Sequence, residues 1–404
     1  MRQTTFSRRQ LLAGTGAALS AGLAGCPANR ETGDDAGSDG GTGRTGPLAA
    51  TNEEDWPMFG ANSQRNPVLT GTDGPAGPVS RDWQFQSHHV APSVVDGTVY
   101  VDDATANYAL DAETGETLWT RDSESDGGMT PVISDDTVYT FDGGGLTALD
   151  PSDGTHLWTD ETLTAGAPVP RDGILYGANG ETVFAFDPGE RELRWSAPLE
   201  SEDADDWNYL MEVAADDTHV YTVEAIGELT AYSIEDGEEQ WSLSTAYFNK
   251  KRFSFTVAGG IVYLTALEGT DTTPKLRAID ASSGEVQWSD SVGILSGVTA
   301  DRVYAPQIDD KGTYQGVYAL DPVSGERLSD RSAIEGFSSV QPIVAGETLY
   351  YATADPVIRA FDLGSGEVRW EFRDSHDEID HLLVAGERVF YKAGGTLHAL
   401  SSDE

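Results

Sequence analysis

The stretch Ala109-Leu110-Asp111-Ala112-Glu113-Thr114-Gly115-Glu116-Thr117-Leu118-Trp119 returns in outline along most of the 404-residue chain. Six further copies begin at Ala148, Ala185, Ala231, Ala278, Ala319 and Ala360. Five of these copies end in tryptophan, and the copy that begins at Ala319 has Ser329 in that place. A repeat of ~40 residues is typical of an array of like supersecondary units.

Each copy predicts a β-hairpin that leads into an outer strand. The Ala-apolar pair ends one strand, the Asp starts a tight turn, and the Gly adopts a backbone conformation that other residues resist. Upstream of each hairpin lies a strand such as Thr98-Val99-Tyr100-Val101, and before that a strand that is often entered through proline, such as Pro92-Ser93-Val94-Val95. Four short strands per repeat are the content of one blade of a β-propeller.

The motif resembles the tryptophan-docking repeat of the PQQ-like, or quinoprotein-type, β-propellers, whose pattern is A-x-D-x-x-T-G-E-x-x-W. Ala109 to Trp119 fits this pattern at every defined position, and the resemblance covers the chain from about Trp83 to Leu400. It implies an all-β propeller in which each docking tryptophan packs between neighbouring blades. The structural docking residues are Trp83, Trp119, Trp158, Trp195, Trp241, Trp288 and Trp370.

The number of blades follows from two incomplete repeats at the ends of the chain. The apolar-aromatic strand occurs eight times, but the docking hairpin is complete only seven times. The last repeat stops at Leu400 with no outer strand, whereas Trp83 lies in an outer strand with no hairpin before it. We therefore expect eight four-stranded blades in a ring that both termini close, an arrangement that removes exposed sheet edges.

The composition indicates a soluble surface adapted to salt. The formal net charge is -43, and only five lysines are present. Such an acid excess keeps a protein hydrated and is used by halophiles, so we expect a lipoprotein of haloarchaeal type. The charge argues against nucleic acid as a partner and against an anionic membrane surface, except through a lipid anchor.

The N-terminus predicts export and anchoring. Residues 1–26 carry Ser7-Arg8-Arg9-Gln10-Leu11-Leu12, which resembles a twin-arginine export motif, and end in Leu23-Ala24-Gly25-Cys26, which resembles a lipobox. Cys26 is the only cysteine in the chain, so we expect lipidation there and a location on the extracellular side of the cytoplasmic membrane. Residues 27–55 form a predicted disordered acidic tether, 56–82 a lead-in packed on the propeller, and 83–404 the propeller.

Two long strand-entry segments form the candidate binding face. The longest spacings between docking positions, 46 and 47 residues, fall at the fourth and fifth blades, and loops of this kind often carry function. The candidate residues are Trp207, Tyr209, Tyr247, Phe248, Lys250, Lys251 and Arg252. They predict a patch for an unidentified protein or an anionic small molecule. The alternative is that the three cations pair with acids of a neighbouring blade.

Four histidines suggest a metal site in another sector. His88 and His89 precede the inner strand of the first blade, and His376 and His381 precede or begin that of the eighth. Ring closure makes these segments neighbours, and imidazole beside carboxylates suits zinc or another divalent metal. The alternative is that all four are solvated loop residues.

Two classes of function remain open. The favoured one is a non-catalytic, monomeric binding or scaffold propeller without a cofactor, similar in its repeats to the lipoprotein of the bacterial outer-membrane barrel-assembly machinery. The other is a PQQ-dependent quinoprotein dehydrogenase that oxidises alcohols or sugars with calcium. The resemblance to those dehydrogenases implies an adjacent cysteine pair, which this chain lacks.

Overall fold

The computed structural model describes residues 55–87, 91–103, 105–123, 129–163, 168–179, 182–199, 210–224, 227–244, 254–266, 275–291, 295, 297–308, 314–331, 340–375 and 378–403. All of them belong to one compact unit, residues 46–404. Within the described residues no helix is long and apolar enough to cross a membrane.

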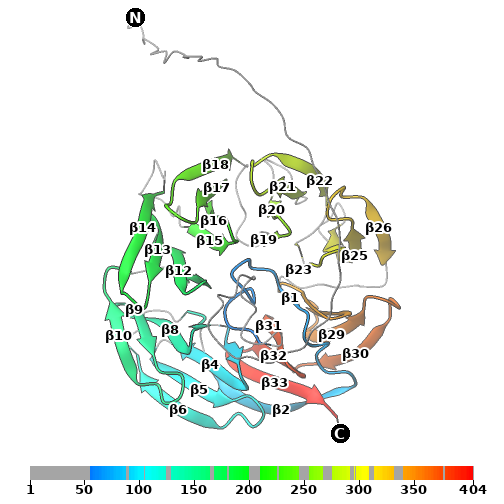
Figure 1. Ribbon diagram of the computed structural model, residues 1–404. Coiled ribbons are helices and arrows are strands. Elements are labelled where there is room, and N and C mark those ends of the chain that lie inside the picture. Colours follow the sequence, from blue (N-terminus) through cyan, green and yellow to red (C-terminus); the bar gives the residue numbers. More distant parts are fainter. Residues whose placement is uncertain are drawn as a thin grey trace, which may run out of the picture. The chain divides into compact units, whose positions relative to one another are not determined.

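The prediction of an eight-bladed, all-β propeller is confirmed, and the blades follow one another around a ring (Figure 1). Blade one contains β3 (Ser93–Val95), β4 (Thr98–Asp103), β5 (Ala106–Asp111) and β6 (Thr117–Asp122). Blade two contains β7 (Val132–Ser134), β8 (Thr137–Asp142), β9 (Gly145–Leu149) and β10 (His156–Asp160). Blade three contains β11 (Val169–Arg171), β12 (Ile174–Ala178), β13 (Thr182–Asp187) and β14 (Glu192–Pro198). Blade four contains β15 (Leu210–Ala215), β16 (His219–Glu224), β17 (Glu228–Ser233) and β18 (Glu239–Ser244).

The second half of the ring repeats this order. Blade five contains β19 (Ser254–Ala258), β20 (Ile261–Ala266), β21 (Lys275–Asp280) and β22 (Val286–Ser291). Blade six contains β23 (Gly297–Val298), β24 (Val303–Ile308), β25 (Tyr314–Leu320) and β26 (Arg327–Arg331). Blade seven contains β27 (Ile343–Ala345), β28 (Thr348–Ala352), β29 (Val357–Asp362) and β30 (Val368–Arg373), with β1 (Val68–Leu69) paired in parallel to β27. Blade eight contains β31 (Ile379–Ala385), β32 (Arg388–Ala393), β33 (Thr396–Ser402) and β2 (Val79–Gln86).

Blade eight is closed by the two ends of the propeller. Its outer strand β2 comes from the N-terminal side, pairs antiparallel with the C-terminal strand β33, and sets Trp83 opposite Ala399. Figure 1 shows the two strands side by side next to the C-terminus. The outer strand begins at Val79, so it also includes four residues of the predicted lead-in. The predicted closure by both termini is therefore confirmed.

An ion pair between half-buried Arg81 and a buried carboxylate holds this closing strand against blade seven. Arg81 on β2 donates to Asp374 over 2.5 Å and to the hydroxyl of Tyr391 over 2.8 Å. The Asp374 side chain is fully buried, and the Tyr391 hydroxyl also donates to it. Burial raises the pKa of Tyr391, and its hydrogen bond to the Asp374 carboxylate raises it further. The phenol therefore stays protonated and donates to the carboxylate at neutral pH.

Five of the docking tryptophans, Trp83, Trp119, Trp195, Trp241 and Trp288, contact a glycine of the next blade. A Cβ atom added to Gly154 would lie 2.6 Å from the Trp119 ring, and one added to Gly115 would lie 2.6 Å from Trp83. Both glycines have a φ near +70°, where side chains are disfavoured. The Trp119 indole also donates to the carbonyl of Pro151 over 2.8 Å. The Thr-Gly of the repeat thus provides the flat surface on which the indole stacks.

In most of the hairpins an aspartate organises the turn that carries this glycine, as Asp111 does in blade one. The Oδ1 atom of Asp111 accepts hydrogen bonds from the backbone amides of Glu113 and Thr114. The bond from Thr114 is the main reason that the pKa of Asp111 is lowered. The aspartate therefore remains ionised and holds the turn in one shape.

The lead-in, residues 55–78, runs along the inner strands of the ring as a belt. Its hydrogen bonds reach the eight blades in their order around the ring. The partners are Trp56 with Val94, Pro57 with Ile133, Ser63 with Arg171 and Ala215, Gln64 with Val257, Asn66 with Val298, Pro67 with Val344, and Thr72 with Gly386. The belt occupies the middle of the ring beside β1 (Figure 1). It therefore satisfies backbone groups of the inner strands that would otherwise be unpaired edges.

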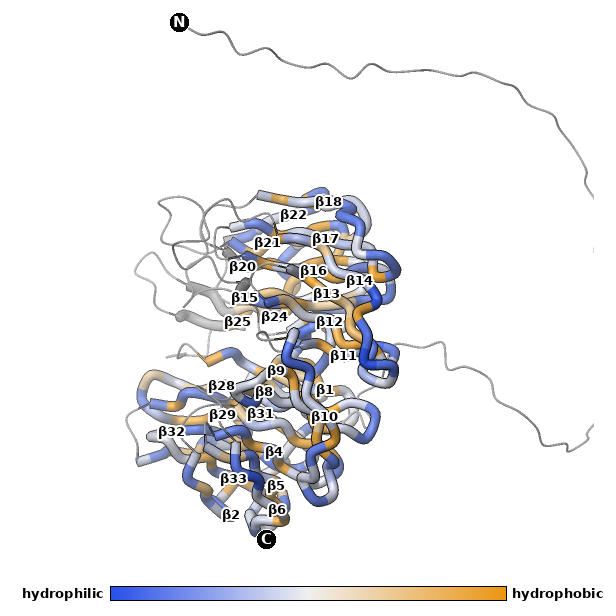
Figure 2. The backbone as a smooth tube through the Cα atoms, turned by 90° about the vertical axis from the view of Figure 1, so that its left-hand side faces the viewer, coloured by the Kyte–Doolittle hydropathy of each residue, from blue (hydrophilic) through white to orange (hydrophobic). Residues whose placement is uncertain are grey.

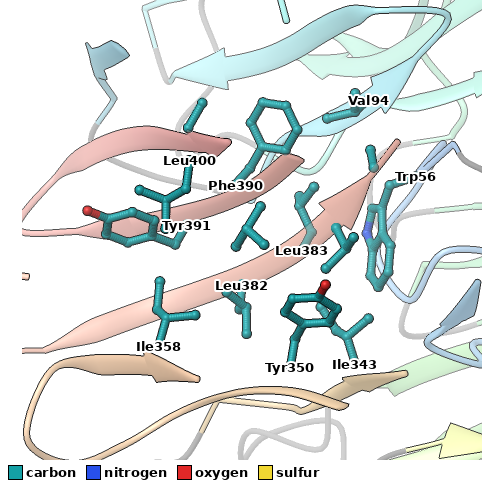
Figure 3. Close-up of a cluster of buried hydrophobic side chains, with 14 of the residues drawn as sticks. Trp56, Val94, Ile343, Tyr350, Ile358, Leu382, Leu383, Phe390, Tyr391 and Leu400 are labelled. Atoms are coloured by element: carbon teal, nitrogen blue, oxygen red, sulfur yellow. The ribbon is translucent and has the colours of Figure 1, made fainter. Parts of the chain in front are cut away.

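The core consists of the apolar faces of neighbouring blades. Figure 2 shows hydrophobic residues along the strands and hydrophilic ones in the turns. In the largest cluster, Trp56 of the belt packs with Val94 of blade one, Tyr350 of blade seven and Leu383 of blade eight (Figure 3). The belt is therefore part of the core as well as a source of hydrogen bonds.

Replacing Trp119 by Ala is expected to lower the free energy of unfolding by roughly 3 to 5 kcal/mol, the usual cost of truncating a buried aromatic residue. Trp119 is 8% exposed, whereas its neighbour Leu118 is 55% exposed. Leu118→Ala should therefore change the free energy by less than about 0.5 kcal/mol. Urea denaturation of both variants tests this, and an equal effect of the two would contradict the docking role.

Replacing Arg65 by Met is expected to loosen the belt in a pH-dependent way. Arg65 donates from Nε to the carbonyl of Val213 over 2.5 Å and lies 3.7 Å from the carboxylate of Glu212. Burial raises the pKa of Glu212, and Arg65 opposes that rise. Without Arg65 the cost should be about 3 kcal/mol at neutral pH, near the lower end for breaking a buried ion pair.

The direction of this pH dependence follows from the raised pKa of Glu212. In the variant the folded protein holds the Glu212 proton more tightly than the unfolded chain does. Part of the lost free energy of unfolding is due to Glu212. That part should be absent below the ordinary pKa of Glu212 and should grow as the pH rises from there through the raised pKa of the folded variant. Melting temperatures of the wild type and Arg65→Met at several pH values measure this. Arg302→Met, at a surface pair with Asp301, is the control, and a pH-independent deficit in Arg65→Met would speak against the Glu212 pair.

Candidate binding face

The candidate face is the one on which the chain enters the inner strand of each blade, and we call it the strand-entry face. The residues proposed from sequence for blades four and five, Trp207, Tyr209, Tyr247, Phe248, Lys250, Lys251 and Arg252, lie outside the described residues. The strands that follow them, β15 and β19, are the inner strands of their blades. The predicted patch therefore stays a prediction.

Of the four histidines proposed as metal ligands, the structure describes only His381. It lies half-buried on β31 and pairs across the sheet with Lys392 on β32. Burial lowers the pKa of His381, and the Lys392 ammonium lowers it further. A cation beside the imidazole disfavours a metal ion there. Within the described residues no group of three His, Cys, Asp or Glu side chains could hold one, and the metal site stays a prediction.

A polar network, not anticipated from the sequence, lies between blades one and two at the strand-entry end. Asp102 is fully buried, and its Oδ2 atom accepts from the Thr140 hydroxyl over 2.8 Å and the Met129 amide over 3.1 Å. Burial raises the pKa of Asp102. Arg121 connects the outer part of the network, because it pairs with Asp142 at 2.9 Å and donates to Asn107.

A second polar group lies between blades eight and one at the same end. Lys392 is 4% exposed and faces the carboxylates of Asp103 and Asp380, which both favour its charged form, although burial lowers its pKa overall. The sequence signal for both groups is an acidic or basic residue at the end of an otherwise apolar second strand, as in Val99-Tyr100-Val101-Asp102-Asp103 and Val389-Phe390-Tyr391-Lys392.

The fold and the docking repeats define a β-propeller built from PQQ-like repeats. The chain belongs to the family described as "Outer membrane protein assembly factor BamB", whose model matches residues 70–206, 179–310 and 273–404. Together these matches cover all the blades.

Curated relatives share part of this propeller. The chain is 26% identical over 153 residues to outer membrane protein assembly factor BamB of Burkholderia pseudomallei, which is 37% of this chain and 38% of that protein. It is 28% identical over 236 residues to the serine/threonine-protein kinase AfsK of Streptomyces coelicolor, which is 55% of this chain and 28% of that protein. The matched region thus spans well under half the length of either relative.

Solved structures share the fold. BamB from Moraxella catarrhalis superposes with a TM-score of 0.57 at 16% identity, over 80% of this chain and 97% of that one. The quinohemoprotein alcohol dehydrogenase ADHIIG from Pseudomonas putida HK5 superposes with a TM-score of 0.64 at 14% identity, over 87% and 81%. At such identities the likeness concerns the fold alone, which is common to a protein named as an assembly factor and to an oxidoreductase.

Proposed function

We propose that this protein is a non-catalytic binding propeller that captures a protein partner on its strand-entry face. The observation that carries the proposal is the family match over residues 70–404. The Burkholderia relative is named outer membrane protein assembly factor BamB, and the Moraxella structure is named BamB, which supports a scaffold role. The partner here is unidentified, since a chain with a net charge of -43 need not share theirs.

The geometry is compatible with such a role. A ring whose inner strands are held together by the belt is a rigid body, and inserted segments can project only from its faces. Binding residues carried on a rigid scaffold lose little conformational freedom when a partner docks. The strand-entry segments of blades four and five combine aromatic residues with three of the chain's few cations.

The alternative is a PQQ-dependent dehydrogenase. Its support is the structural likeness to a quinohemoprotein alcohol dehydrogenase, which concerns the fold alone. The chain has a single cysteine, Cys26, so the adjacent cysteine pair of those enzymes is absent. Purified protein with added PQQ and calcium should reduce no dye with alcohols or sugars as donors. Turnover under these conditions would favour the dehydrogenase instead.

The binding face can be tested by capture from native membranes in high salt. Replacing Trp207 and Arg252 by Ala should weaken capture at least tenfold, since aromatic and Arg anchors at a hot spot are worth about 2 kcal/mol or more each. The melting temperature should change little. Exposed Leu157→Ala, on the outer strand of blade two, is the matched control. Full retention of the partner by the double variant would place the binding surface elsewhere.

The proposed location is the extracellular side of the cytoplasmic membrane, reached by the twin-arginine route, with a lipid on Cys26. Support comes from the lipobox-like Leu23-Ala24-Gly25-Cys26 and the preceding Arg8-Arg9. The acid-rich composition is consistent with a halophilic exoprotein.

Changing Cys26 to Ser should release the protein into the medium, because one lipid-modified residue is the only anchor proposed. Immunoblots of the membrane and medium fractions measure this. Arg8-Arg9→Lys-Lys should instead keep the protein inside the cell. Membrane retention of Cys26→Ser equal to that of the wild type would disprove the lipid anchor.

A further inference from the structure

Asp102 is a buried carboxylate that the proposed function does not use. It lies near the end of β4, is 0% exposed, and faces blade two, where its Oδ2 atom accepts from the Thr140 hydroxyl and the Met129 amide. Its Oδ1 atom is also buried and has no hydrogen-bond partner in the part of the chain that the structure describes. Buried polar atoms are nearly always satisfied, so this oxygen requires an explanation.

A chain of hydrogen bonds leads to the Oδ2 atom from the outer part of the seam. Arg121 on β6 donates to the side-chain carbonyl of Asn107 over 3.3 Å. The Asn107 amide donates to the Thr140 hydroxyl over 3.4 Å, and that hydroxyl donates to Asp102 over 2.8 Å. A guanidinium group only donates and a carboxylate only accepts, so every bond in the chain points toward Asp102. The Oδ2 atom is therefore fixed as an acceptor, which leaves Oδ1 as the place for a proton.

The charges around Asp102 do not neutralise it. The charged residues of the elements beside it are Asp103 on β4, Arg121 and Asp122 on β6, Asp142 on β8, and Glu124 and Asp126, which precede Met129 and lie outside the described residues. Asp142 and Asp103 both disfavour the ionised form of Asp102, and Arg121 pairs with Asp142 at 2.9 Å. Among the described residues no cation pairs with Asp102, so its ionised form is costly to bury.

A proton on Oδ1 removes this cost and leaves the hydrogen bonds at Oδ2 in place, because a neutral carboxyl group still has a carbonyl oxygen that accepts. Burial raises the pKa of Asp102, although the hydrogen bonds from Thr140 and Met129 oppose the rise. The folded protein therefore binds this proton more tightly than the unfolded chain does. Its stability gain is complete below the ordinary pKa of aspartate and is lost as the pH rises through the raised one.

From this geometry we infer that Asp102 is a proton-binding site, which takes up one proton on Oδ1 as the medium becomes mildly acidic and thereby stabilises the seam between blades one and two. The inference does not depend on the proposed protein partner, which is assigned to blades four and five. Failure of either leaves the other standing.

The experiment is urea denaturation of the full-length wild type and Asp102→Asn between about pH 4.5 and about pH 8. Asparagine matches a protonated carboxyl group in shape and charge but does not titrate. The unfolding equilibrium constant of the wild type, divided by that of Asp102→Asn, should fall on acidification by up to about tenfold per pH unit, the limit for one proton. Glu212 titrates in both proteins and cancels in this ratio.

Asp122→Asn is the matched control, since it makes the same change at an exposed position at the same end of blade one. The ratio of the wild type to this variant should not depend on pH. A ratio for Asp102→Asn that is equally independent of pH, or that rises on acidification, overturns the inference.

Thr140→Val tests the same site without changing Asp102. It removes a donor that favours the ionised form of Asp102, and hydrogen bonds to charged groups are stronger than those to neutral ones. The variant should therefore unfold more readily than the wild type by a factor that is roughly fivefold larger at about pH 8 than at about pH 4.5. A buried hydroxyl with a merely structural role predicts a factor independent of pH, and that result would also overturn the inference.

Discussion

The stacking of one tryptophan on one glycine of the next blade is the contact on which the ring depends. Five docking glycines, at residues 115, 154, 237, 284 and 325, have φ values between 70° and 73°, and a Cβ atom there would lie 2.5 to 2.7 Å from the indole. The indole nitrogen then donates to a carbonyl of the same hairpin, as Trp241 does to Ala281 over 2.9 Å. A blade that carries both the tryptophan and the glycine thus gives an indole to one neighbour and a glycine turn to the other, so the contact can continue from blade to blade.

Such a chain of contacts has two open ends until the ring closes, and the N-terminal segment satisfies both. Trp83 on β2 docks on Gly115 of blade one. On the other side of blade eight, where no docking hairpin of its own exists, the Trp370 indole donates to the carbonyl of Pro75 over 2.9 Å. The belt therefore replaces the docking turn that blade eight lacks, and β2, the strand that follows the belt, supplies the docking tryptophan of blade eight, Trp83. The ring is complete only when both ends of the propeller are in place.

Where a blade departs from the repeat sequence, its backbone conformation or its packing against the next blade differs as well. In blade three Arg191 occupies the place of the docking glycine and adopts a φ of 56°, a conformation that is unfavourable for a side chain. In blade six Ser329 occupies the place of tryptophan, yet it pairs with Ala319 as Trp119 pairs with Ala109. The strand pairing thus sets the register without the indole, and the indole adds packing between blades. Asp102 and Lys392 are a third kind of departure from the repeat. Each is a buried polar residue near the end of an otherwise apolar second strand, on the strand-entry face.

The sequence by itself determined the architecture, since a repeat with a fixed turn, glycine and tryptophan specifies local hairpins and one kind of contact between neighbours. Counting incomplete repeats was enough to predict eight blades and the pairing of Trp83 with the C-terminal strand, because hydrogen-bonding edges must be satisfied. What only the tertiary structure decided is where non-repeated residues meet. The path of the belt depends on one or a few hydrogen bonds to each of the eight blades. The row of side chains that runs across blade eight from His381 to Phe85 depends on cross-strand register and on which face of blade eight meets blade one. Neither has a period along the chain, so the sequence marks Lys392 and Asp103 as charged residues at strand ends but does not show that the two face each other.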